Sequence, residues 1–153
     1  MDKDRVSVEP ETFLTDEALS QECVARVTEA WSTDRRLGAV VSFAGVVRGD
    51  MVDGSPVAAI EFSAHREMAE ESVRRLVERL VADTRSDTVR IYLRHALGRV
   101  PRGGIPIVII VGTSHRKEAF SLCSGILELF KQEVPIYGKE LTDSGGHSWK
   151  ENR

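Results

Sequence analysis

Basic residues stand at the start of one expected helix, where they could bind an anion. Ser114-His115-Arg116-Lys117 opens that helix, although cations oppose the positive end of the helix dipole there. Free backbone N–H groups in the first turn attract anions, and Arg116 can hold a phosphate through two parallel hydrogen bonds. The alternative is a solvated first turn capped by Ser114. The segment therefore indicates either an anion site or an ordinary helix start.

Two further cations have residue types and positions that suit chemistry. Arg48 follows an apolar strand and opens a loop rich in glycine and aspartate, and sites are often built on such loops. Lys131 lies between Phe130 and Pro135 at a helix C-terminus, which favours a cation in any case. A chemical role for Lys131 requires nearby cations that lower its pKa and free an amine. Lys139, in the strand that follows, is a candidate neighbour, but spacing alone does not bring the two together.

Three helices and a mixed sheet are expected to position these residues. Apolar residues at helical spacing predict helices over 15–31, 67–83 and 114–133. Apolar or alternating runs predict strands over 38–47, 57–63, 89–95 and 106–113. Residues 48–56 read as a loop, RVPRGG as a turn, and residues 136–152 as a closing hairpin. The order αββαββαββ predicts an α+β fold with a mixed or antiparallel sheet and three main helices.

Length and composition predict a single domain over residues 1–153, with an acidic and flexible N-terminal segment over 1–14. The net charge of −3 is far from the basic footprint of a nucleic-acid-binding protein. No apolar run approaches the length of a membrane span, and no signal core is present, so we expect a cytoplasmic protein. Neither the two cysteines nor the four histidines have the spacing of a metal site, so no metal site is expected.

Five segments in order resemble one family, the large catalytic (MoaE-type) subunit of molybdopterin synthase. They are GAVVSFAGVVRG, IEFSAHREMAEES, RHALGRVPRGG with PIVIIVGTSHRKEAF, ELFKQEVPIYGKE and GHSWKEN. The resemblance covers about residues 37–152. It implies an α/β hammerhead-type fold and a homodimer within a heterotetramer.

The resemblance also implies an activity. A small ubiquitin-like sulfur carrier, whose Gly-Gly tail ends in a thiocarboxylate, would insert that tail into a pocket of this chain. Sulfur would pass from the tail to cyclic pyranopterin monophosphate, giving molybdopterin in the synthesis of the molybdenum cofactor. The implied enzyme is a sulfurtransferase with no metal or organic cofactor.

Site residues carry over position by position. Lys131 matches the first catalytic lysine of the family, and His115 and Arg116 match its His-Arg pair. The remaining substrate-binding positions implied by the resemblance are Val46, Val47, Arg48, Gly138, Lys139 and Glu140. The central hairpin departs slightly, because Ala96 follows His95 where the family often has arginine.

The second catalytic lysine of the family is missing, because Gly138 occupies its position and Lys139 matches the base that follows. Adjacent side chains of a regular strand point to opposite faces, so Lys139 is expected to face away from the pocket unless a glycine-permitted bulge re-aims it. Either Lys139 substitutes, or the site uses Lys131 with Arg48 and Arg116. The alternative function is a catalytically impaired paralogue that only binds a ubiquitin-like tail. A further alternative is a general phosphate-binding domain.

Overall fold

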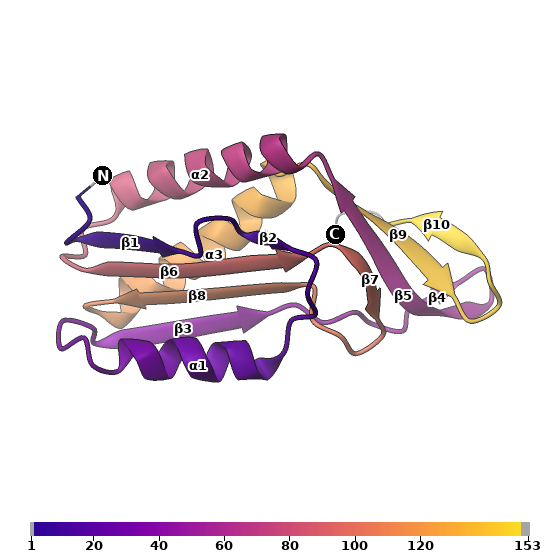
Figure 1. The fold of residues 1–153 in the computed structure, drawn as a ribbon, viewed down its shortest axis with the longest axis horizontal. Coiled ribbons are helices and arrows are strands. Elements are labelled where there is room, and N and C mark those ends of the chain that lie inside the picture. Colours follow the sequence, from indigo (N-terminus) through magenta and orange to yellow (C-terminus); the bar gives the residue numbers. More distant parts are fainter. Residues whose placement is uncertain (1, 151–153) are drawn as a thin grey trace.

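The computed structural model describes residues 2–150, in which three helices flank one sheet and a second sheet projects from its end (Figure 1). The helices are α1 (Gln21–Trp31), α2 (Arg66–Asp83) and α3 (Arg116–Glu133). The strands are β1 (Val6–Glu9), β2 (Leu14–Thr15), β3 (Ala39–Ala44), β4 (Met51–Val52), β5 (Ser55–Ala64), β6 (Val89–Ala96), β7 (Gly98–Pro101), β8 (Ile107–Thr113), β9 (Ile136–Thr142) and β10 (His147–Trp149).

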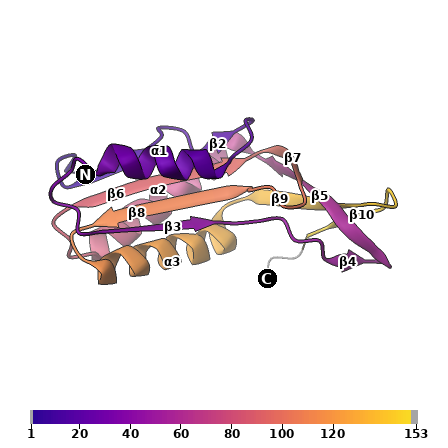
Figure 2. The ribbon, with the colours of Figure 1, turned by 90° about the horizontal axis from the view of Figure 1, so that it is seen from below.

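The first sheet has the strand order β1-β6-β8-β3, with β2 beside β6. β1 and β2 run parallel to β6, and the other pairs are antiparallel, so the sheet is mixed as predicted. Alternate residues of β8 enter two cores: Ile109 packs with α2 and α3, whereas Ile110 packs with α1. Figure 2 shows α1 on one face of this sheet and α3 on the other.

The second sheet is antiparallel, in the order β10-β9-β5-β4 with β7 also on β5. It has a small core of its own, in which Val47 packs with Val57, Ile60 and Phe62. Because β9 follows directly on α3, the end of that helix and the start of this sheet are tied together. The expected α+β hammerhead-type fold with three helices is confirmed.

The N-terminal segment differs from the expectation of a flexible 1–14. β1 adds to the sheet edge at β6, and Val6 is 3% exposed. Phe13 is also buried, with its ring edge-on to that of Phe130 at 5.8 Å. Because most residues of 1–14 are polar or acidic, the composition of the segment did not indicate that these few apolar side chains would be buried. Pairing of β2 with β6 also explains why α1 begins at Gln21 rather than at residue 15.

Two short strands lie where a loop and a turn were expected. β4 falls within 48–56, and β7 begins at Gly98 and includes the first three residues of RVPRGG. β7 forms because β5, about forty residues earlier in the chain, offers it backbone partners, a non-local cause that turn-forming residues conceal. β4 has a local cause, because Asp53 and Gly54, both at positive φ, form a two-residue hairpin turn that pairs Val52 with Ser55. The closing hairpin forms as predicted through residue 150, and residues 151 and 152 of it lie outside the described residues. Within residues 2–150, no helix is both long and apolar enough to cross a membrane.

Candidate functional site

A cleft of about 1100 Å³ lies where the two sheets meet. Its walls come from the loop after β3, the C-terminal end of α3, the buried end of β6 and the hairpin β9–β10. Of the positions expected from sequence, five line it: Val46, Arg48, Lys131, Gly138 and Glu140. Segments far apart in the chain converge here because α3 is followed directly by β9 of the second sheet.

The Arg48 loop is held by backbone hydrogen bonds. The N–H of Gly45 donates to the carbonyl of Ile107, and that of Val47 donates to the carbonyl of Gly104, each at 3.0 Å. Val47 is 3% exposed in the core of the second sheet, so the residues on either side of it point outward. Val47 thus anchors the loop, and Arg48 reaches the cleft rim. There its guanidinium pairs with the Asp50 carboxylate at 3.2 Å, in an exposed and hence weak ion pair.

Lys131 occupies the last turn of α3, where the helix dipole favours a cation. The preceding residue, Phe130, is buried and fixes the rotation of this turn. Its ring stacks on that of His95 with the centroids 5.6 Å apart. The exposed side of the turn then directs Lys131 to the cleft. Arg48 and Lys131 therefore line the same cavity.

Gly138 and Glu140 line the cleft, and Lys139 does not. The pairing of β9 with β5 is regular here, with Gly138 opposite Phe62 and Lys139 opposite Glu61. The register shift in this pair falls at Val57–Ala59, at the other end of β5. Within the described residues, no bulge therefore re-aims Lys139 toward the cleft.

Lys150 also lines the cleft, and sequence reasoning did not single it out. Its backbone N–H donates to the Gly138 carbonyl at 2.7 Å, at the end of the β9–β10 ladder. Desolvation lowers the pKa of its amine, the Lys131 and Arg48 cations lower that pKa further, and the Glu140 carboxylate partly opposes them. The signal was available in the hairpin register, because a turn at DSGG sets residues 138 and 150 opposite each other.

His95 forms a buried part of the cleft wall. Its ring lies edge-on to Phe62, with centroids 4.9 Å apart, and burial lowers its pKa to about 4. The ring is thus neutral near pH 7. Because a carbonyl only accepts hydrogen bonds, Nδ1 carries the proton and donates to the Ala96 carbonyl at 2.7 Å. The cations of the cleft therefore lie beside an uncharged wall, which strengthens their attraction for anions.

His115 and Arg116 do not reach this cleft in the same chain. They lie at the N-terminus of α3, and Lys131 lies 15 residues later in the same helix, which corresponds to roughly 22 Å. Both are exposed. No side-chain hydrogen bond caps the helix at His115, so the backbone N–H groups of the first turn are accessible to an anion or to solvent.

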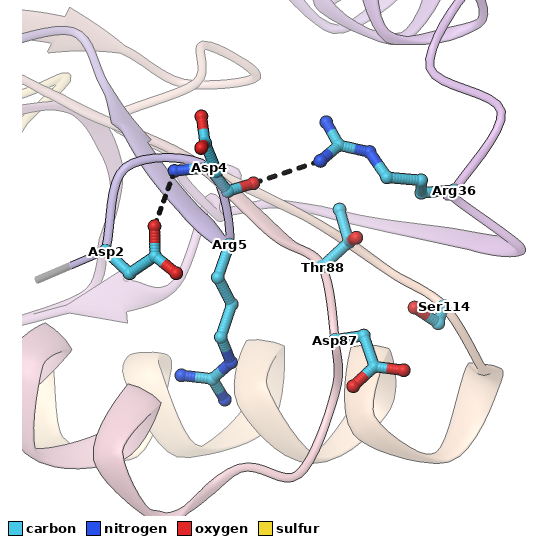
Figure 3. Close-up of a pocket in the computed structure, with 7 residues that line it drawn as sticks. All are labelled: Asp2, Asp4, Arg5, Arg36, Asp87, Thr88 and Ser114. Carbon is cyan, nitrogen blue, oxygen red and sulfur yellow. Dashed lines mark hydrogen bonds between the residues drawn. The ribbon is translucent and has the colours of Figure 1, made fainter.

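A second, smaller pocket of about 440 Å³ lies near the N-terminus (Figure 3). Its arginines already have partners. Arg5 donates to the carbonyls of Thr84 and Ser86 at 2.7 and 2.9 Å, and Arg36 pairs with Asp34 at 2.9 Å. With Asp2, Asp4 and Asp87 among the lining residues, this pocket is poorly suited to an anion. Among residues 2–150, no group of three or more metal-ligating side chains is found either.

Comparison with known proteins agrees with the family resemblance found in the sequence. A family model described as "MoaE protein" matches residues 14–133. The molybdopterin synthase catalytic subunit of Nostoc sp. is 34% identical over 123 residues, covering 78% of this chain and 72% of that protein.

Solved structures share the fold. The crystal structure of molybdopterin synthase from Staphylococcus aureus has a TM-score of 0.79 at 24% identity and covers 94% of this chain and 98% of its own. A complex of subunits 1 and 2 of molybdopterin-converting factor from Helicobacter pylori gives 0.75 at 19% identity, covering 94% and 92%. On the sequence matches, this chain belongs to the MoaE protein family.

Proposed function

We propose that this chain is the catalytic subunit of a molybdopterin synthase, a sulfurtransferase. It transfers sulfur from the C-terminal thiocarboxylate of a small ubiquitin-like carrier to cyclic pyranopterin monophosphate. One observation carries the proposal: Arg48, Lys131 and Lys150, from three separate segments, line a single cleft. Both reactants are anionic, so such a cleft suits each of them.

The geometry of the cleft also suits the reaction. Its volume, about 1100 Å³, lies just above the usual range of small-molecule pockets and leaves room for a pterin and an extended tail. A diglycine tail needs little width because it has no side chains. When the acyl–sulfur bond breaks, a water molecule supplies the oxygen that replaces sulfur, so the sulfur stays on the pterin and the carrier ends in an ordinary carboxylate. The fixed cations stabilise the negative charge of the thiocarboxylate before this step and of the carboxylate after it, without the cost of reorienting water.

His115 and Arg116 belong to the site in this proposal, but to that of a second copy of the chain. They lie roughly 22 Å along α3 from Lys131, too far for contact with the same bound ligand. The resemblance implies a homodimer, in which a helix N-terminus of one copy can complete the cleft of the other. There the pair would hold the cyclic phosphate.

The experiment combines the chain with a thiocarboxylated carrier and the pyranopterin precursor, and the dithiolene product is detected. We expect product from the native chain. Lys131→Ala should lower its rate of formation by about 10²–10⁴-fold, as expected for a lost proton-transfer or charge-stabilising group, with the fold retained. Absence of product from the native chain contradicts the proposal and supports a binding-only paralogue. Native-rate conversion by Lys131→Ala contradicts the assignment of this lysine.

A further inference from the structure

Gly138 and Lys150 are directly opposed in the closing hairpin. Trp149 pairs with Lys139, and the next hydrogen bond of the ladder joins the Lys150 N–H to the Gly138 carbonyl. A Cβ atom built on Gly138 would lie 3.6 Å from the Cβ of Lys150. Opposed residues project from the same face of a sheet. A side chain at either position therefore starts from nearly the same point, and both positions line the cleft.

The electrostatic environment places the Lys150 amine among the charges of the site. Lys131 and Arg48 both disfavour its protonated form, and Glu140 and Asp50 both favour it. All four line the cleft: Lys131 lies on α3 and Glu140 on β9, and the other two lie in the loop after β3. Exposed charges interact measurably only within about a Debye length, ~10 Å. Lys150 thus belongs to the same cationic centre as Lys131 and Arg48.

The surroundings of Gly138 favour a lysine across the ladder over one at position 138. A Cβ there would lie 3.0 Å from Cγ2 of Ile60 and 3.3 Å from Cε1 of Phe62, so both neighbours would have to yield slightly. Both belong to the core of the second sheet, and close-packed side chains yield at a cost. Lys150 brings an amine to the same place from the end of β10 without that crowding.

We propose that Lys150 is the second substrate-contacting amine of the cleft and takes the part that a lysine at position 138 would play. The inference rests on the sulfur-transfer function proposed above. As an ammonium, Lys150 has three N–H donors for an anionic reactant in the cleft. These donors add to those of Lys131. No covalent bond to Lys150 is required. The proposal also removes the need for Lys139, which lies outside the cleft.

The test uses the full chain with its thiocarboxylated carrier and the pyranopterin precursor. Lys150→Met keeps most of the length of the side chain and the backbone hydrogen bond to Gly138, and removes the charged amine with its N–H donors. We expect the rate constant at saturating substrate to fall by about 10²-fold, as for the loss of one fixed charge-stabilising donor. The dissociation constant for the carrier and the melting temperature should stay near native values. Lys150→Arg should retain more activity than Lys150→Met.

A second-site variant tests whether the two positions are interchangeable. Adding Gly138→Lys to Lys150→Met should raise the rate at least about 10-fold, while Gly138→Ala in the same background should not. The proposal is overturned if Lys150→Met stays within about threefold of an active native chain, or if Lys139→Met loses the activity instead. It is also overturned if the folded Gly138→Lys/Lys150→Met chain shows no recovery. An inactive native chain contradicts the proposed function itself, so the two failures are distinguishable.

Discussion

Mixed dimers offer a sharp test of how the active site is assembled. Lys131 and Arg116 lie roughly 22 Å apart along one helix, so a single chain cannot bring both to one ligand. If Arg116 serves the cleft of the second copy, each site combines Lys131 of one chain with Arg116 of the other. The variants Lys131→Ala and Arg116→Ala then damage different halves of every site.

The size of the effect follows from counting sites. Each variant alone forms homodimers in which both sites are damaged, and loss of a charge-stabilising donor leaves about 1% of the native rate. Random mixing in equal amounts makes about half of the dimers mixed, because the two-fold interface is the same in each. A mixed dimer has one site with both defects and one intact site. About a quarter of all sites are then intact, roughly 25-fold above the background of either variant.

The assay is co-expression of the two variants with different affinity tags, purification through both tags, and measurement of dithiolene formation with the thiocarboxylated carrier. The doubly purified dimer should recover about half of the native rate, since one of its two sites is intact. Sites built within one chain predict no recovery, because every chain then carries a defect. A mixed dimer as inactive as its parents, with the dimer shown to be intact, refutes the reasoning.

Two further predictions concern stability and protonation. Ile109→Ala, at a fully buried position in β8, should destabilise the fold by about 2–5 kcal/mol and Ile109→Val by about 0.5–1.5 kcal/mol in chemical denaturation. His95 should remain neutral down to about pH 4 in an NMR titration; because its pKa in the folded chain lies below the ordinary value of 6.5, it should cost stability as pH falls from 6.5 toward 4. Titration of His95 near pH 6.5 contradicts the second prediction.

Much of the scaffold could be predicted because its signals are local. The apolar stripe of residues 67–83 predicts α2, which spans Arg66–Asp83, and the continuous apolar run after Pro106 predicts β8. β1 and β7 could not be predicted in this way, since each is short and forms because a distant strand offers it hydrogen bonds. β4 has a local cause, the two-residue Asp53-Gly54 turn that joins it to β5, and the interpretation of residues 48–56 as a loop overlooks it. Pro101 and its neighbouring glycines even favour a turn where β7 lies.

The residues of the site also differ in whether local sequence could predict them. Arg48 and Lys131 could be chosen from residue type and resemblance, and the structure places both on the cleft. Lys139 was a candidate because it follows Gly138 in sequence, but strand alternation keeps it off the cleft. Lys150 could be recognised only from the register between β9 and β10, which is a relation between strands.

The proposal for Lys150 implies that a catalytic group can change its sequence position and keep its place in space. Opposed residues of a ladder start only a few ångströms apart, and a lysine side chain is longer than that separation. An amine can therefore move across the ladder from position 138 to position 150 and still reach the same anion. The glycine left behind relieves crowding against Ile60 and Phe62. On this argument, loss of a lysine at position 138 is evidence against activity only when its cross-strand partner also lacks an amine.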